Sequence, residues 1–283
     1  MNFLKQAEEP LFPDILWNRP LVKNRGGRLL ALGGHSRGFA AIQAVFQLAE
    51  AAGIGECLIG IPDSLAKLVG DAPEIMGLPA SPSGSLGKAA LGEVLHTVAD
   101  CDGLLVGLDL TNNSETAVLV ESVLQKAEKP IMMTEEALDT LPGSAQVITE
   151  NAEAVLIGSM NAIIAVANRN KLALQLRPEK QLIGRIEAVQ QIADAAKCAL
   201  VIIGREIIVC ADGQTSITPQ RGDASDHPAV QAVFAPFWLQ NKSKRFEALT
   251  TAAFVLSKSL PADQDLTYGQ IAGSIRTALQ HFS

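Results

Sequence analysis

Short apolar runs alternate along this chain with longer, alanine-rich runs whose apolar residues recur every three or four positions. The short runs have the length of buried strands, and the longer runs have the period of helices. Because the short runs are apolar on both faces, they indicate parallel strands covered by helices on both sides. The expected strands are Arg28–Leu32, Glu56–Ile61, Gly103–Leu108, Pro130–Thr134, Gln146–Thr149 and Ala199–Ile203, and the expected helices are Ala40–Ala52, Asp63–Val69, Leu86–Ala99, Ser114–Glu128, Glu135–Leu141 and Ala152–Asn168.

The alternation of short and long apolar runs changes after residue 203. Two short apolar runs, Glu206–Cys210 and Thr215–Thr218, flank an Asp-Gly pair, which is a strong hairpin signal. The pattern therefore predicts a mostly parallel, doubly wound α/β sheet with an antiparallel edge hairpin. Further helices are expected at Ala229–Gln240, where Pro236 should cause a kink or an end, and at Phe246–Leu260 and Tyr268–Phe282. Since no interdomain linker stands out, we expect a single domain over residues 1–283, with residues 1–27 as an N-terminal extension.

The amino-acid composition limits the partners and the cellular location that we expect. Hydrophobic residues make up 48% of the 283 residues and charged residues 19%, which predicts a large interior or a buried interface, and hence a homo-oligomer. The net charge of −7 comes without a basic block and argues against nucleic acid and against an anionic membrane surface. The N-terminal segment does not resemble a signal peptide, and no apolar stretch has membrane-spanning length, so we expect a cytoplasmic protein. The four cysteines read as buried thiols, and no metal site is predicted.

The most distinctive motif is Gly34-His-Ser-Arg-Gly38, between the first expected strand and the first expected helix. As G-x-S-x-G it reads as the nucleophile elbow of a serine hydrolase, with Ser36 as nucleophile. As a glycine-rich turn before a helix it is a place where backbone N–H groups meet an anionic ligand. A purely structural turn is the third interpretation. Against the hydrolase, at most one expected strand precedes Ser36, and only His227 lies in a loop suited to a catalytic base.

Several segments carry a resemblance to a known family. Residues 30–39 read Leu-Ala-Leu-Gly-Gly-His-Ser-Arg-Gly-Phe, the next helix ends in Ala52-Gly-Ile-Gly55, and the second strand closes in Ile61-Pro-Asp-Ser64. This order resembles the opening of the ribokinase-like NAD(P)H-hydrate dehydratase family, with its G-S-x-G turn, A-G-A-G helix end and P-x-S strand end. The resemblance implies a ribokinase-like fold and the dehydration of hydrated NADH or NADPH with ADP or ATP. It leaves open whether Mg²⁺ accompanies the nucleotide.

The resemblance and the carboxyl ends of the expected strands also imply site residues. Arg37 would contact phosphate, and Asp223 or Asp226 would take the place of the family's catalytic aspartate, although Asp226 also suits a helix cap. Ligand contacts are expected at Gly34, Ser36, Arg37, Gly38, Ala41, Gly107, Asn112, Asn113, Thr149, Asn151, Gly204 and Gly222. Asn113 or Ser114 has a second interpretation as the cap of the following helix.

The chain departs from the family where phosphate chemistry is expected. The family's G-x-G-D is absent, and the corresponding loop reads Gly222-Asp-Ala-Ser-Asp-His-Pro228. Ile203 stands where the family has a lysine, and Thr134-Glu-Glu136 replaces D-A-D. An isoleucine cannot stabilise phosphate charge, so we expect weakened or lost activity. The alternatives are a non-catalytic nucleotide-binding or structural homologue, a small-molecule kinase of the carbohydrate type and the serine hydrolase.

Overall fold

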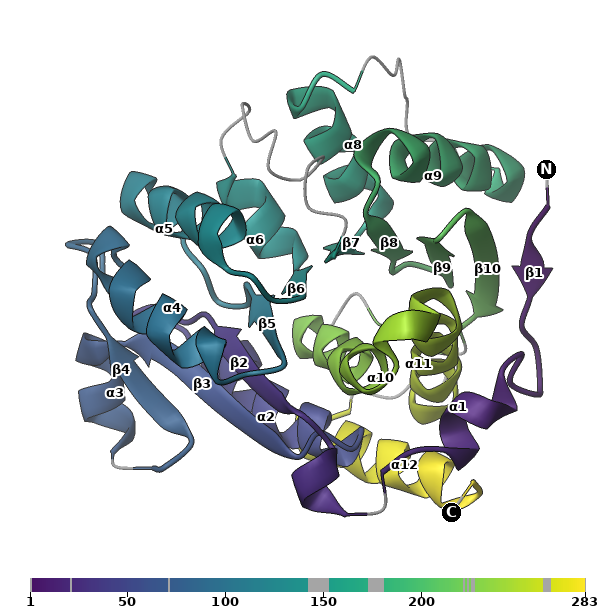
Figure 1. The fold of residues 1–283 in the computed structure, drawn as a ribbon, viewed down its shortest axis with the longest axis horizontal. Coiled ribbons are helices and arrows are strands. Elements are labelled where there is room, and N and C mark those ends of the chain that lie inside the picture. The colour runs from purple at the N-terminus through teal and green to yellow at the C-terminus, as the bar shows by residue number, and fades with distance from the viewer. Residues whose placement is uncertain are drawn as a thin grey trace.

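A row of ten strands forms the centre of the computed structural model, which describes residues 2–20, 22–70, 72–141, 153–172, 181–220, 222, 224, 227–261 and 266–282 (Figure 1). Across the sheet the strands are β1 (Leu4–Lys5), β10 (Gln214–Pro219), β9 (Glu206–Ala211), β8 (Ala199–Ile202), β7 (Ala154–Gly158), β6 (Ile131–Met133), β5 (Gly103–Val106), β2 (Arg28–Leu32), β3 (Glu56–Pro62) and β4 (Ile75–Leu78).

Strand directions confirm the expected sheet. All strands from β4 to β8 pair in parallel, β9 runs antiparallel to β8, and β10 runs antiparallel to β9. In the hairpin turn, Asp212 and Gly213 have φ of 53° and 73°, values that Asp-Gly pairs adopt readily. Beyond the hairpin lies β1, which pairs in parallel with β10 and which the sequence pattern did not predict.

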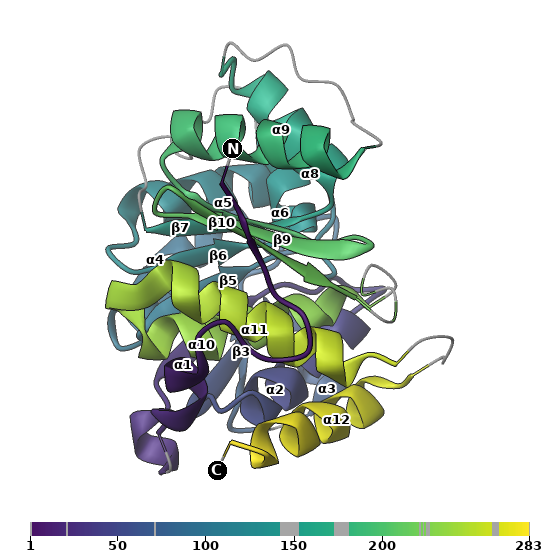
Figure 2. The same cartoon turned by 90° about the vertical axis from the view of Figure 1, so that its right-hand side faces the viewer.

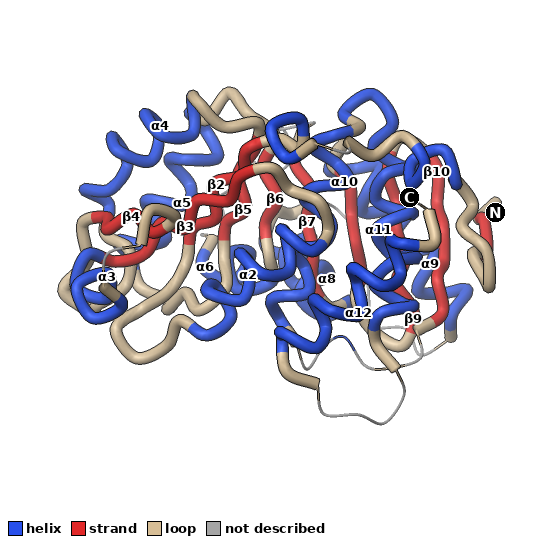
Figure 3. The backbone as a smooth tube through the Cα atoms, turned by 90° about the horizontal axis from the view of Figure 1, so that it is seen from below, coloured by secondary structure: helices blue, strands red, loops and turns tan. Residues whose placement is uncertain are grey.

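Helices cover both faces of the sheet, as the doubly wound pattern predicts (Figures 2 and 3). One layer contains α4 (Leu91–Ala99), α5 (Ser114–Lys126), α6 (Glu135–Thr140), α8 (Met160–Arg169) and α9 (Leu182–Ala196). The other contains α1 (Pro13–Trp17), α2 (Ala40–Ala51), α3 (Asp63–Val69), the 3₁₀ helix η4 (Pro228–Val233), α10 (Phe234–Gln240), α11 (Arg245–Ser259) and α12 (Tyr268–Gln280).

The two cores follow from alternation along the strands. On β2, Leu29 and Ala31 pack into one core, and Leu30 and Leu32 into the other. The four cysteines lie buried in these cores, as expected, and desolvation raises the pKa of Cys57 and of Cys198 to about 12. Because thiols in this state stay protonated, they act as small apolar side chains.

One predicted helix was wrong. Residues 152–168 were expected to be helical, but Ala154–Gly158 forms strand β7, and helix α8 begins only at Met160. The break falls at Ser159, whose hydroxyl accepts a hydrogen bond from the Ala162 N–H and caps α8. The sequence reading also missed β4, α1 and α9. The expected strand at 146–149 lies outside the described residues.

Several boundaries differ from the prediction. The strand expected to reach Leu108 ends at Val106, because Gly107, Leu108 and Asp109 all have positive φ. The helix expected from Leu86 is α-helical only from Leu91. Pro236 is the third residue of α10 and does not end it, because the first N–H groups of a helix have no intrahelical partner.

Candidate functional site

The backbone N–H groups of the glycine-rich turn between β2 and α2, residues 33–38, all donate to groups of the protein. His35 and Gly38 exchange backbone hydrogen bonds of 2.9 and 3.0 Å, and the Arg37 N–H donates to His35 Nδ1 at 3.0 Å. The remaining N–H groups, those of Gly33, Gly34 and Ser36, donate to the carbonyls of Gly60, Leu108 and Gly84. An anion could therefore use these six N–H groups only by displacing acceptors of the chain.

The N-terminus of α2 is occupied as well. Asp109 Oδ2 accepts hydrogen bonds from the Ala41 N–H at 2.7 Å and from the Ile42 N–H at 3.0 Å. A carboxylate at a helix N-terminus satisfies unpaired donors and complements the helix dipole. Ala41, which was expected to contact ligand, therefore already holds this side chain through its backbone.

The N-terminus of η4, next to the loop with the candidate aspartates, offers no free N–H at its first three residues either. Pro228 has none, the Ala229 N–H bonds to the Tyr268 hydroxyl, and the Val230 N–H donates to the His227 carbonyl at 2.9 Å. The residue before η4 is His227, without a side-chain cap. Asp223, Asp226, Thr149 and Asn151 lie outside the described residues, so their predicted roles stay predictions.

The hydrolase interpretation finds little support in the described part of the chain. There, no hydrogen bond joins the Ser36 hydroxyl to a histidine, and the His227 ring packs against Tyr268 with centroids 5.8 Å apart. Two strands precede Ser36. One is β2, which leads into the turn, and the other is β1, which lies at the far edge of the sheet, seven strands from β2. The strand before Ser36, β2, has the parallel neighbours that a nucleophile elbow needs, β3 and β5, but the described residues do not supply the base beside the hydroxyl.

The other expected ligand contacts that the structure describes lie in several different loops. Asn113 is the cap of α5, as its second interpretation had it, and its side chain accepts from the Thr116 N–H at 3.0 Å. Asn112 and Arg37 are exposed, and within the described residues Arg37 has no ion pair.

The two glycines expected late in the chain have contacts with the protein. Gly204 lies between β8 and β9, where its carbonyl accepts a hydrogen bond from the Gln220 side chain. Gly222 packs so close to the Pro261 carbonyl that a Cβ there would lie 2.5 Å from the oxygen.

A cavity of about 330 Å³ opens at the carboxyl ends of β5 to β8. This is the edge at which open α/β sheets bind ligands. Apolar and polar groups share its wall, which consists of Leu108, Thr134, Glu135, Glu136, Asp139, Gly158, Ser159, Ile203, Ala224, Pro228 and Gln231. Gly158 and Ser159 contribute to this wall from the carboxyl end of β7, which lies between β6 and β8.

Three carboxylates line this cavity, and none of the described residues in its wall is a lysine or an arginine. Both Glu135 oxygens bind Ser159, one at its N–H (2.7 Å) and one at its hydroxyl (3.0 Å). Glu136 accepts from the Leu110 N–H at 3.0 Å, and desolvation, helped by the nearby charge of Asp109, raises the pKa of its carboxyl. The field inside the cavity therefore favours neutral or cationic groups over a bare phosphate.

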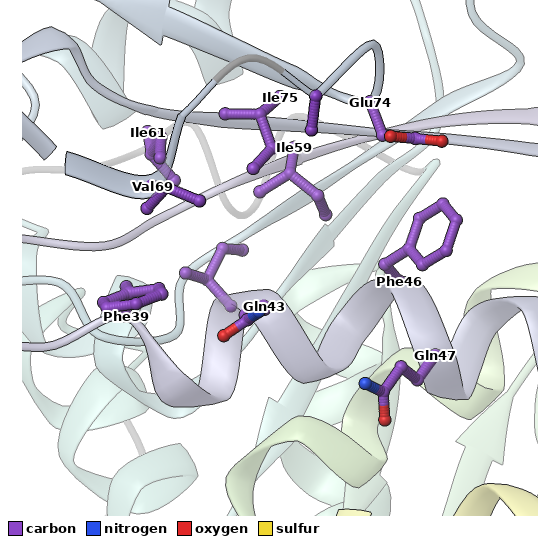
Figure 4. A pocket seen from close by; sticks show the side chains of 11 residues that line it. Phe39, Gln43, Phe46, Gln47, Ile59, Ile61, Val69, Glu74 and Ile75 are labelled. Carbon is purple, nitrogen blue, oxygen red and sulfur yellow. The ribbon is translucent and has the colours of Figure 1, made fainter. Parts of the chain in front are cut away.

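A second cavity, of about 150 Å³, lies between α2 and the strands β3 and β4 (Figure 4). Phe39, Gln43 and Phe46 face Ile59 and the neighbouring apolar side chains across it. Glu74 is the one charged residue among the described residues of its wall. Because no cation is among these residues to hold a phosphate and Glu74 is the one carboxylate that could transfer a proton, this cavity is the weaker candidate for a catalytic site.

Comparison with known proteins bears on this arrangement. No family model matches the chain. Over 199 residues, 68% of the chain, it is 28% identical to a bifunctional NAD(P)H-hydrate repair enzyme, Nnr, from Moorella thermoacetica. The matched part covers 36% of that enzyme, so the chain spans about a third of the curated relative. The resemblance predicted from the opening motifs is thus confirmed.

Solved structures extend the comparison to the whole sheet. A ribokinase-like superfamily protein from Enterococcus faecalis V583 superposes with a TM-score of 0.72 at 13% identity, covering 100% of the chain and 98% of its own. The fold is ribokinase-like. An ADP/ATP-dependent NAD(P)H-hydrate dehydratase from Bacillus subtilis, crystallised with ATP and Mg²⁺, shares it with a TM-score of 0.65 at 14% identity, and each chain is covered fully.

The described residues hold neither a cluster of metal ligands nor a membrane-spanning helix. Within them, no group of three or more His, Cys, Asp or Glu side chains is placed to hold a metal ion. None of the helices described here is both long and apolar enough to cross a bilayer.

The sequence analysis did not predict four residues of the strand-end region, namely Asp109, Ser159, Tyr268 and Gln231. Only Asp109 and Ser159 had a signal in the sequence, because each follows an apolar run.

Proposed function

We propose that this chain is a nucleotide-binding homologue of the ADP- or ATP-dependent NAD(P)H-hydrate dehydratases, in which dehydration is weakened. The similarity to the repair enzyme supports the ligand class, and the 330 Å³ cavity at the strand ends supports the place where it binds. Ligand cavities of this kind begin at about 300 Å³ and combine apolar walls with a few polar groups.

The cavity suits the uncharged part of a nucleotide better than the phosphates. Leu108, Ile203 and Ala224 supply apolar wall for a ring. Phosphoryl transfer, the chemistry that a bound nucleotide supplies, depends on donors and cations around the phosphates. Near the start of α2, the N–H groups of Ala41 and Ile42 already bind Asp109. In η4, the Ala229 N–H bonds to Tyr268, and Ile203 offers no charge. One missing electrostatic group of this type lowers a rate by about 10²–10³-fold, which is the physical reason for proposing slow turnover.

Arg37 is the cation that we assign to the phosphates in this proposal. It stands on the turn next to the strand ends and has no ion pair within the described residues. Its guanidinium would give a charge-assisted, bidentate contact. The acidic lining would then need Mg²⁺ or Arg37 to offset its repulsion of the nucleotide. Either Asp223 or Asp226 would take the hydroxyl proton of the hydrated nicotinamide ring.

Thermal melting with ligands, combined with a turnover assay, tests this proposal. We expect millimolar ADP or ATP to raise the melting temperature, because a ligand that binds the native state stabilises it. Arg37→Ala should reduce the shift produced by ADP and leave that produced by adenosine unchanged. Hydrated NADH should be consumed slowly, and Asp→Asn at 223 or 226 should stop the remaining turnover. If neither nucleotide shifts the melting temperature at any Mg²⁺ concentration, the proposal is wrong.

A further inference from the structure

The cavity between α2 and the strands β3 and β4 is separate from the strand-end cavity. The described residues that line the two cavities have no member in common. The smaller cavity lies towards the β4 edge of the sheet, in the layer that contains α2 and α3 (Figure 4). Its own wall therefore determines which ligand it accepts.

The wall is apolar along most of its length. Ile42, Ile59 and Ile61 are almost fully buried, and the half-buried rings of Phe39 and Phe46 complete the apolar surface. The volume of about 150 Å³ is that of an apolar cavity that holds one benzene-sized ring. Because ordered water needs several polar partners, an apolar ring is favoured over water in this part of the cavity.

The polar groups of the wall are confined to one end and to the mouth. Figure 4 shows Val69 at one end of the cavity and Phe46 and Glu74 at the other. Gln43 and Gln47 lie one turn apart on α2, and both are exposed, so the cavity opens to solvent along this helix. A ligand that enters here meets an apolar end and a charged end.

Glu74 gives the second end its charge. It is half-buried, and no ion pair in the described ranges of the chain includes it. Lys23 is near enough for its charge to interact with Glu74, but its ammonium group donates to Glu50 at 2.8 Å. A carboxylate and an aromatic ring at the same end of a cavity favour an ammonium group, which gains an ion pair and a cation–π contact with Phe46. The same charge repels phosphates and carboxylates.

We propose that this cavity binds a monocyclic amine, in which a ring of benzene size and a protonated amino group are joined by a short aliphatic linker. The ring packs against the isoleucines at the end marked by Val69, and the ammonium group lies at Glu74 and Phe46. Size selects the ring, and charge selects the amine over the corresponding acid. The site is additional to the proposed nucleotide site and does not depend on it, because the described residues of the two walls differ.

Calorimetric titration with phenethylamine tests this assignment. Phenethyl alcohol and propylamine are the reference probes, because the first lacks the charge and the second lacks the ring. We expect phenethylamine to bind the wild type at millimolar concentration, and propylamine to bind at least about tenfold more weakly, since it buries no ring. Phenethyl alcohol should bind about fivefold more weakly than phenethylamine, since it makes no ion pair.

Glu74→Gln removes the charge and retains the shape of the side chain. This variant should bind phenethylamine about fivefold more weakly than the wild type does, and phenethyl alcohol with unchanged affinity. Glu121→Gln is the matched control. Glu121 is also half-buried and has no ion pair among the described residues, but it lies on α5 in the opposite layer. The control should bind both probes as the wild type does.

Val69→Phe fills the apolar end and provides a second readout. Val69 is half-buried at the end of α3, so the larger ring occupies the cavity and not a packed core. Phenethylamine and phenethyl alcohol should no longer bind, while the melting temperature of the ligand-free variant stays close to that of the wild type.

Three results would overturn the inference. The first is no binding of phenethylamine to the wild type, the second is equal binding to Glu74→Gln, and the third is undiminished binding to a folded Val69→Phe variant. If Val69→Phe does not fold, the comparison of Glu74→Gln with Glu121→Gln decides alone.

Discussion

At the scale of single residues, the contact between Gly107 and Thr134 fixes the shape of the candidate site. Gly107 has φ of 126°, a conformation that residues with a Cβ rarely adopt, and its Cα lies against the Thr134 side chain. The chain can turn sharply after β5 only with glycine here. This turn brings Leu108 into the cavity wall and Asp109 onto the end of α2.

Gly107→Ala should therefore be strongly destabilising. The unfavourable φ costs about 1–2 kcal/mol, and the overlap with Thr134 adds about 1–3 kcal/mol. Gly213→Ala is the control, because Gly213 also has positive φ, 73°, but no atom within 4 Å of a built Cβ. Urea unfolding should give a clearly larger loss for Gly107→Ala; equal losses would show that the contact with Thr134 has no energetic weight.

Glu136 should make stability depend on pH. Desolvation raises the pKa of its carboxyl in the folded protein above the ordinary 4.5. The folded state thus binds the proton more tightly than the unfolded state, so the favourable contribution is complete below that ordinary value and is lost as the pH rises through the folded pKa.

Glu136→Gln removes this titration and retains an oxygen for the Leu110 N–H. We expect the free energy of unfolding of the variant, relative to the wild type, to increase between pH 4 and pH 7. Denaturant unfolding at several pH values measures this difference. A difference that stays constant or decreases over this range would contradict the assignment of desolvation as the main cause.

At the scale of elements, the helix N-termini distinguish this sheet from one that presents free N–H groups to phosphate. The second and third N–H groups of α2 bind Asp109, and those of the first three residues of η4 are absent or bonded within the chain. N–H groups that could bind an anion bind groups of the protein instead. The family's phosphate-binding motifs are missing from the sequence, and in the fold the corresponding N–H groups are already bonded.

Asp109 should stabilise the start of α2. Asp109→Gly removes the carboxylate and suits the positive φ of 55°, so the loss reports the cap rather than backbone strain, and we expect about 1–2 kcal/mol. Asp109→Asn keeps an acceptor oxygen and should cost less. Melting curves of both variants check the order. If Asp109→Gly matches the wild type, the two hydrogen bonds contribute nothing to stability.

Element prediction succeeded where the hydrophobic period was clear and failed where it was ambiguous. The 28–32 strand and the 63–69 helix were predicted with their observed bounds, because glycine or proline flanks each apolar run. Ala154–Gly158 was read as the start of a helix, because its apolar run continues directly into the helical pattern of α8.

At the scale of the whole molecule, the parallel sheet and its antiparallel hairpin could be anticipated but the cavity could not. Parallel strands with helical crossovers follow from the alternation of patterns, and the hairpin follows from Asp212-Gly213. The cavity brings together residues 108, 134–139, 158–159, 203 and 228–231, whose proximity depends on strand order and on the packing of η4. No local signal in the sequence encodes that proximity. The single domain, the homo-oligomer and the cytoplasmic location stay predictions.

The most direct test of the account is a crystal structure of the protein soaked with ATP and Mg²⁺. We expect density for the nucleotide at the carboxyl ends of β5 to β8, with the base against Leu108 and Ile203 and the phosphates towards Arg37. Density in the apolar cavity between α2 and β3, or no bound nucleotide at saturating concentration, would contradict it.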